Sequence, residues 1–195
     1  MKELQEEDFM GAVEIIKSDP FVPLRETVIE TNSLDNEMCS SHNKHNRLYM
    51  KARPLEDDLV AAINDGRIGP HDNPVVRSNF RREEFSWDED RSKNIWCLGP
   101  NTTGPNMVLN MCRETPNLNE VKDSIVCAFE AASRVGPLVG ENMRGVYFEV
   151  SHVELHEDAI HRGRSKIFPI AQKVMHAAYL KATPRLMEPF CLVDI

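Results

Sequence analysis

An α+β fold is predicted by the way extended and helical patterns alternate along this chain. Between Gly145 and Val153, apolar and polar residues alternate, which is typical of a half-buried strand. Between Leu118 and Arg134, apolar residues recur at three- and four-residue spacing, which is typical of an amphipathic helix. The sequence contains no internal repeat. Strand–helix–strand passages near the C-terminus favour a mixed fold.

Length and composition are compatible with one large domain or two small ones. The chain has 195 residues, of which 41% are hydrophobic, and this is enough to bury a core. No apolar run reaches the roughly 18 residues of a membrane-spanning helix. The five cysteines are odd in number and lack C-x-x-C spacing, as expected for free thiols in the cytosol or nucleus.

The N-terminal part contains two predicted strands, at 21–30 and 45–53. Residues 1–19 form a separate piece that is too short to bury its own apolar face. Pro23 places the first strand at a sheet edge or at its start. The polar segment 31–41 is predicted to be a loop. In the second strand, every second residue is apolar, which predicts one buried face.

The middle of the chain predicts two helices and two short strands. One helix is expected to begin at Pro54 and to end before Gly66, which occupies the position after the C-cap. A second, highly charged helix is expected over 74–87. Short strands are expected at Ile95–Leu98 and Met107–Met111, on either side of a Gly/Pro-rich turn.

The last third predicts two longer helices and a closing strand. Asn117 is expected to cap the helix 118–134, with Glu120 in the acidic position of a capping box. Its buried stripe is expected to consist of Leu118, Val121, Ile125, Ala128, Phe129 and Ala132. The following helix is expected to carry Pro169 in its first turn. A strand is expected at 190–195.

Charge is distributed unevenly. The net charge is −8, which alone argues against a nucleic-acid partner. Two segments, 42–53 and 161–173, nevertheless contain four cations each and no acid. The cations of the first segment are Lys44, Arg47, Lys51 and Arg53. Those of the second segment are Arg162, Arg164, Lys166 and Lys173. Two basic loops on an acidic body indicate a tip that binds a polyanion; the alternative is two solvated loops without a partner.

Two local segments partly match motifs that bind nucleotides or metal ions. The segment 99–106 has the glycine spacing of a phosphate-binding loop, but Pro105 and Asn106 replace the Lys and Ser/Thr. It therefore predicts a rigid turn without nucleotide binding. His156 and His161 are one residue further apart than in the H-E-x-x-H zinc motif. On a helix they would not share a face, so a zinc hydrolase using His156, Glu157 and His161 is a minor alternative.

The segment 41–47 is dense in hydrogen-bond donors without bulky apolar residues. Such side chains suit contacts to phosphate and 2′-hydroxyl groups of RNA. The alternative is a polar hairpin loop.

The sequence resembles eukaryotic and archaeal translation elongation factor 2, the ribosomal translocase, along most of its length. The similar segments are Arg25–Thr27, Asn43–Ala52, Ile95–Cys97, Gly99–Pro100, Thr103–Asn106, Leu118–Ser124, Glu141–Gly145, Asp158–Gly163 and Pro184–Pro189. A related spliceosomal GTPase shares much of this pattern, but Asp158-Ala159-Ile160 favours the translation factor.

The resemblance implies a domain organisation and a fold. Residues 1–19 would end the family's third domain, 20–185 would form its fourth domain, and 186–195 would begin its fifth. The fourth domain resembles the second domain of ribosomal small-subunit protein five, with helices on one face of a four-stranded sheet. GTP and Mg²⁺ would belong to the family's GTPase domain, so neither a cofactor nor covalent chemistry is expected in this sequence.

The resemblance also implies partners and contact residues. A cytoplasmic monomer is expected, whose tip binds small-subunit ribosomal RNA, A-site transfer RNA and messenger RNA, and neither DNA nor a membrane. The implied RNA contacts are Asn43, Lys44, His45, Asn46, Arg47, Asp158, Arg162, Gly163, Arg164 and Lys166. His161 aligns with the histidine that the family converts to diphthamide. The family commonly continues with Gly-Gly-Gln, where this chain has Arg164-Ser165-Lys166.

Overall fold

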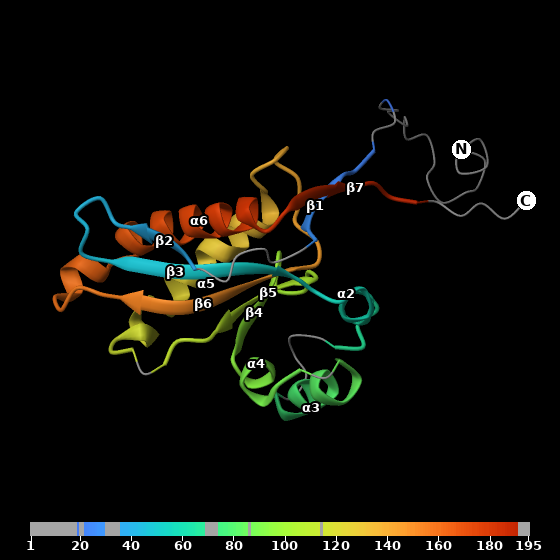
Figure 1. Ribbon diagram of the computed structural model, residues 1–195, viewed down its shortest axis with the longest axis horizontal. Coiled ribbons are helices and arrows are strands. Elements are labelled where there is room, and N and C mark those ends of the chain that lie inside the picture. The colour runs from blue at the N-terminus through green and yellow to red at the C-terminus, as the bar shows by residue number, and fades with distance from the viewer. Residues whose placement is uncertain are drawn as a thin grey trace, which may run out of the picture.

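The computed structural model describes residues 19, 22–29, 36–68, 74–85, 87–113 and 115–190, without the side chains of 74–77. Its mixed strand and helix content confirms the α+β class. The elements are β1 (Arg25–Val28), β2 (Glu37–Ser40), β3 (Arg47–Pro54), α2 (Asp57–Asn64), α3 (Pro74–Phe85), α4 (Glu89–Lys93), β4 (Ile95–Gly99), β5 (Asn106–Asn110), α5 (Leu118–Arg134), β6 (Val146–Glu154), the 3₁₀ helix η1 (Ala159–Arg162), α6 (Arg164–Lys181) and β7 (Pro184–Met187) (Figure 1).

The main sheet has five strands in the order β2-β3-β6-β5-β4, one more than the four expected. The extra strand, β2, lies inside the segment 31–41 that was expected to be a loop. It pairs antiparallel with β3 at the sheet edge. Because β2 is an edge strand with mostly half-buried residues, it lacks the apolar alternation by which strands are found in sequence. β1 and β7 form a separate two-stranded sheet.

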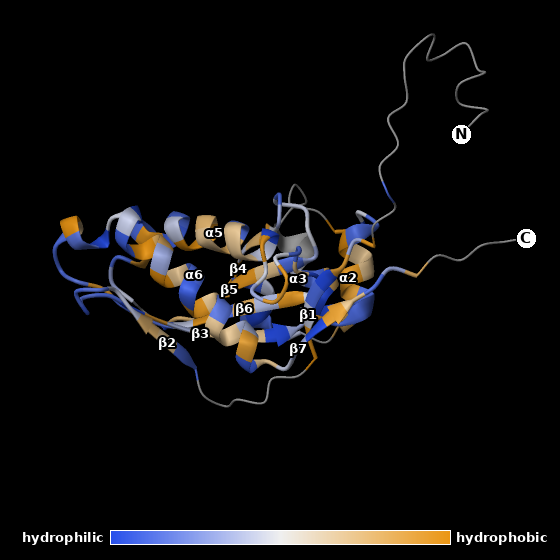
Figure 2. Cartoon of the chain, turned by 90° about the horizontal axis from the view of Figure 1, so that it is seen from above, coloured by the Kyte–Doolittle hydropathy of each residue, from blue (hydrophilic) through white to orange (hydrophobic). Residues whose placement is uncertain are grey.

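Helices α5 and α6 lie side by side on one face of the sheet (Figures 1 and 2). The bounds predicted for α5, 118–134, are confirmed. Phe129 on this helix packs edge-on against Phe148 of β6, with 6.1 Å between ring centroids. The predicted buried face of β3 is also confirmed, since Leu48, Met50 and Ala52 are all buried in this core.

A second, smaller core covers the opposite face of the sheet. There α2 contributes Leu59 and Ile63, which join Trp87 and Tyr147 in one cluster. Helices therefore cover both faces, whereas one face was expected. For the same reason the prediction of a half-buried β6 is wrong: both faces are buried from Val146 to Val150.

Two helix starts differ from the predictions. Asn117 has left-handed backbone geometry, and its side chain does not cap α5. The Glu120 carboxylate forms an ion pair with Arg162 and does not form the predicted capping box. α6 begins at Arg164, so Pro169 lies inside the helix and not in its first turn. The helix tolerates the lost hydrogen bond because Ile167, Ile170 and Ala171 are buried around it in the core.

The ends of the chain fall largely outside the described residues. The separate piece expected at 1–19 is described only at Asp19, and the strand expected at 190–195 only at Phe190, which is exposed coil. β7 runs across the domain boundary expected at 185–186, so that boundary stays a prediction. None of the described helices has the length and apolar composition that crossing a bilayer requires.

A buried carboxylate fixes the loop between α5 and β6. Glu26 of β1 is 0% exposed, and its carboxylate accepts backbone N–H bonds from Leu138, Val139 and Glu141 at 3.0, 2.9 and 3.2 Å. Three N–H donors offset the loss of hydration of this charge. A Cβ added to Gly136 would overlap the same carboxylate.

We predict that Gly136→Ala lowers the free energy of unfolding by about 2 kcal/mol or more, because the added methyl displaces the Glu26 carboxylate from its donors. Urea denaturation measures the effect. Gly163→Ala is the control: a Cβ there meets nothing within 4 Å, so the loss should stay below about 1 kcal/mol. Equal losses for both variants would contradict the role assigned to Glu26.

Candidate nucleic-acid interface at the tip

The hairpin between β2 and β3 forms one half of the tip. The Ser41 N–H donates to the Asn46 carbonyl at 2.8 Å, and the Lys44 N–H donates to the Ser41 carbonyl at 2.7 Å. Lys44 adopts a left-handed backbone with φ of 59°, as tight turns require. This turn leaves Asn43, Lys44 and His45 exposed at its outer side.

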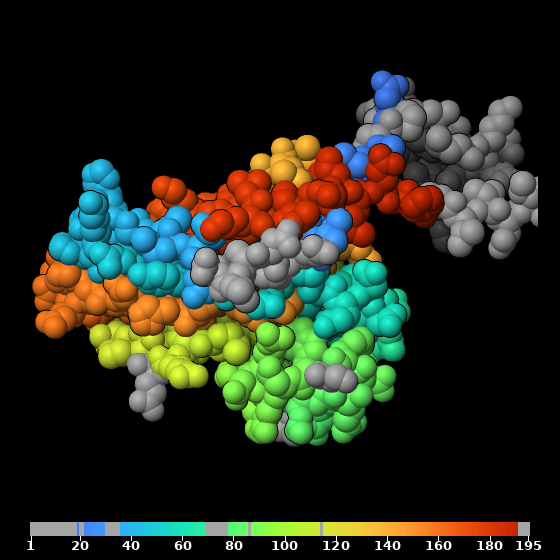
Figure 3. All heavy atoms as spheres, viewed as in Figure 1, coloured from blue at the N-terminus to red at the C-terminus, as the bar shows by residue number. Residues whose placement is uncertain are grey.

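The segment from β6 to α6 forms the other half. After β6, the chain passes through His156 and the 3₁₀ helix η1, and then enters α6 at Gly163. The Gly163 carbonyl accepts the N–H groups of Lys166 and Ile167. Arg164, Ser165 and Lys166 therefore form the first turn of a helix, where a loop was expected. Because β3 and β6 are neighbours in the sheet, the two halves meet at the same end of the molecule (Figures 1 and 3).

The side chain of Asn46 joins the two halves. It is 0% exposed; its Nδ2 donates to the His161 carbonyl at 2.8 Å, and its Oδ1 accepts the His156 N–H at 3.1 Å. A primary amide can donate and accept at once, so one side chain holds both ends of the second segment against the hairpin. Asn46 was expected to contact RNA, but the structure places it as an internal support.

Arg162 is a second internal support. It is 8% exposed; its Nη2 donates to the Glu120 carboxylate at 2.7 Å and its Nη1 to the His156 carbonyl at 2.8 Å. Nη1 also donates to the Glu157 carbonyl. The guanidinium thus ties the tip to α5, in contrast to the RNA contact expected for it. Sequence reasoning missed Glu120 as its partner, although an acid in a first helical turn was the available signal.

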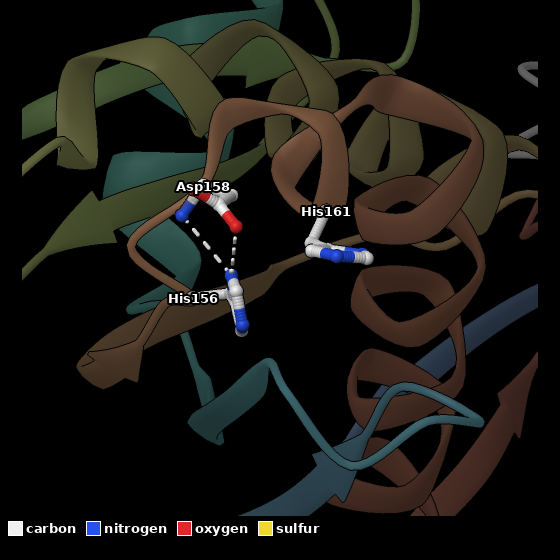
Figure 4. Close-up of side chains that lie close together, drawn as sticks. All are labelled: His156, Asp158 and His161. Carbon is white, nitrogen blue, oxygen red and sulfur yellow. Dashed lines mark hydrogen bonds and ion pairs between the residues drawn. The ribbon is translucent and has the colours of Figure 1, made fainter.

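Three imidazole rings gather where the halves meet. The His161 ring centroid lies 4.5 Å from that of His156 and 5.3 Å from that of His45, and His45 lies 4.6 Å from His156. Figure 4 shows His161 and His156 with Asp158 beside them. The spacing of His156 and His161 would separate them on an α-helix, but a bend and the 3₁₀ helix η1 join them here, and their rings come together.

The exposed cations of the tip come from both halves. Lys44, Arg164 and Lys166 are exposed, and none of them makes an ion pair with another described residue. Arg47 is also exposed and pairs with Glu154 at 3.0 Å. The N-terminus of α6 adds the positive end of a helix. Two exposed carboxylates, Glu157 and Asp158, lie within the same tip, so the tip is not free of acids as a whole.

The remaining tip residues are distributed between surface and interior. Asp158 and Gly163 are exposed, and His161 is half-buried. Ile160 is 86% exposed, an apolar side chain on η1 that the sequence reasoning did not single out. The other cations of the two basic segments lie away from the tip: Arg53 is at the far end of β3, where it pairs with Glu149 at 3.2 Å.

The glycine-rich segment at 99–106 forms the predicted tight turn. A Cβ on Gly104 would overlap the Gly99 carbonyl. The N–H groups of Asn101 and Thr102, which would face a phosphate in a nucleotide-binding loop, donate to the Glu130 carboxylate at 2.8 and 3.2 Å. These two amides are therefore occupied from within the protein.

Burial keeps the thiols of two cysteines protonated. It raises the pKa of Cys97 to about 12 and that of Cys112 to about 11, so both remain protonated thiols at neutral pH. Among the described cysteines, Cys39, Cys97, Cys112 and Cys127 are all free.

A comparison with known families identifies a relationship for most of the second half of the chain. The family described as elongation factor G, domain IV, matches residues 69–183, which is more than half of the chain. The matched range includes the second half of the tip and ends at residue 183, just after α6. The hairpin at 41–47 lies before it.

We predict that Asn46→Ala lowers the free energy of unfolding by about 2 to 3 kcal/mol, because two buried hydrogen bonds are lost and their backbone partners stay buried. Urea denaturation measures the loss, and limited proteolysis should cut the tip first. His42→Ala, at an exposed position in the same hairpin, is the matched control and should be nearly neutral. An Asn46→Ala chain as stable as the control would contradict the supporting role.

Proposed function

Because the chain belongs to the elongation factor G domain IV family, we propose that it is the tip domain of a ribosomal translocase of the elongation factor 2 type. It binds small-subunit ribosomal RNA, transfer RNA and messenger RNA in the A site. GTP and Mg²⁺ act in the GTPase domain of such factors, so this chain does no covalent chemistry and holds no cofactor. It acts as a cytoplasmic monomer.

The joining of two distant segments into one tip carries this proposal. Asn46 and His161 are 115 residues apart in sequence, yet Lys44 and Arg164 are presented at the same end of the molecule. A site for an extended RNA needs cations and hydrogen-bond donors gathered on one surface. Asn43 and His45 supply donors between these cations.

Charge favours contact through the tip. The whole chain carries a net charge of −8, so an RNA surface repels most of the molecule. Lys44, Arg164 and Lys166 are not neutralised by described carboxylates, and the N-terminus of α6 attracts phosphate oxygens. Glu157 and Asp158 oppose this attraction locally. We infer that phosphates approach the first turn of α6, which carries both Arg164 and Lys166.

His161 is the proposed site of diphthamide modification. Its ring is half-buried and lies at the tip surface beside His156. Its backbone is held by Asn46, so an added side chain would extend from a fixed point. The intact mass of the protein from its natural source tests this proposal: an unmodified mass would remove it without affecting the RNA-binding role.

We predict that the double variant Lys44→Glu/Arg164→Glu binds purified ribosomes at least about 10-fold more weakly at low salt, because two phosphate contacts become repulsive. The slope of log K against log salt should become shallower by roughly 1.4 to 1.8, since each of the two lost phosphate contacts contributes about 0.7 to 0.9. Ribosome pelleting over a series of salt concentrations measures both quantities.

The matched control is Arg67→Glu/Lys93→Glu, which changes the net charge equally at exposed positions near α2 and α4. It should retain the affinity and most of the slope. An unchanged salt slope in the tip variant would contradict the proposal. Pelleting with small nuclear ribonucleoproteins and not with ribosomes would favour the spliceosomal GTPase instead.

A further inference from the structure

The histidines of the tip lie close enough together to hold a metal ion. One ligand atom from each of His156, Asp158 and His161 lies within 4.8 Å of the others (Figure 4). The Nδ1 of His156 is 4.0 Å from the carboxylate Oδ2 of Asp158. Two imidazoles and a carboxylate form a ligand set suited to Zn²⁺ and similar ions, and a poor one for Mg²⁺ or Ca²⁺, which prefer oxygen ligands.

A fixed backbone supports this ligand set. Asn46 bonds to the backbone of both His156 and His161, and Arg162 bonds to the carbonyls of His156 and Glu157. Metal ligands that are held by buried hydrogen bonds lose less freedom when the ion binds. The two histidines are therefore presented as a pair before any ion arrives.

A fourth ligand is available from the hairpin. The His45 ring centroid is 4.6 Å from that of His156 and 5.3 Å from that of His161. His45 is exposed, so its ring can turn toward an ion between the other two. Four ligands complete the tetrahedral shell that Zn²⁺ adopts. An ion bound in this way would bridge the two halves of the tip.

We propose that the tip binds one divalent transition-metal ion of the Zn²⁺ class through His156, Asp158 and His161, with His45 as the fourth ligand. The proposal concerns the chain with an unmodified His161 and does not depend on RNA binding, because it rests on ligand atoms that lie within 4.8 Å of one another in the tip.

Binding requires a small contraction of the cluster. Zn²⁺ lies about 2.0 to 2.2 Å from nitrogen and oxygen ligands, so in a tetrahedral site these are roughly 3.3 Å apart. Rotation of the exposed Asp158 side chain and of the His161 ring can supply the change. At present the Nδ1 of His156 accepts the Asp158 N–H at 3.0 Å. An ion that took this lone pair would release the Asp158 amide.

The ion would also alter the charge of the tip. Asp158 is an exposed carboxylate in a surface that otherwise presents cations and imidazoles. A dication at this point raises the net charge of the tip by two, and one of these charges offsets the Asp158 carboxylate. The tip then attracts a polyanion more strongly.

The test is titration of the 195-residue protein with Co²⁺, followed by its visible absorption, and then displacement by Zn²⁺. We expect one ion per chain, tetrahedral absorption without thiolate-to-cobalt charge transfer, and no competition from excess Mg²⁺. His161→Asn and Asp158→Asn should each weaken binding at least about 10-fold, and Asn46→Ala by roughly 10- to 100-fold as a supporting residue. Circular dichroism checks that each variant folds.

His152→Asn is the matched control, because His152 is exposed on the neighbouring strand β6 and lies outside the cluster. It should bind Co²⁺ as the unaltered chain does. Binding that survives in a His156→Asn/His161→Asn double variant, or that shows thiolate charge transfer, would overturn the proposal. If no Co²⁺ bound below millimolar concentrations, the proposal would also be overturned.

An independent readout is the Asp158 amide in a nitrogen–proton correlation spectrum recorded with diamagnetic Zn²⁺. Its proton should shift on binding, because its acceptor is lost, while the Gly66 amide, far from the tip, should not. An unmoved Asp158 amide at saturating Zn²⁺ would exclude Nδ1 of His156 as a ligand and overturn the proposed site. Neither experiment contains RNA, so failure here leaves the translocase proposal intact.

Discussion

The tip depends on a single buried amide. Asn46 donates to one carbonyl and accepts one N–H from a segment more than 100 residues away, and it is fully enclosed. Inside a protein such bonds are strengthened, and each is costly to leave unmade. The hairpin and the histidine-bearing segment can therefore be presented as one surface, although they are far apart in the sequence.

Some cations of the tip are buried and support its structure, whereas others are exposed to solvent. The sequence around them does not distinguish the two kinds. Arg162 is buried and fully paired, with the Glu120 carboxylate on one side and backbone carbonyls on the other. A buried guanidinium needs such partners to offset its lost hydration. Arg164, two residues further on, stands in the first turn of α6 and is exposed. The pairing of the first keeps the second in place, at the end of the molecule and clear of its acidic body.

The sheet sets where this surface lies. β3 and β6 pair along most of their length, and both are sealed by apolar side chains, β6 on both of its faces. Covering β6 from two sides restricts its movement relative to the helices, since close-packed cores resist displacement. The ends of these two strands then become a fixed base for the hairpin and for η1.

Local periodicity in the sequence was enough to determine α5, the buried face of β3 and the position of β6, because burial on one side leaves a regular spacing of apolar residues. Composition was enough to find the two basic segments. Only the tertiary structure placed β2, which is polar and short, and decided that Asn46 and Arg162 are internal while Lys44 and Arg164 are external. It also brought His45, His156 and His161 together. Burial and the meeting of distant side chains depend on which surfaces pack against one another, and no local pattern of residues records that.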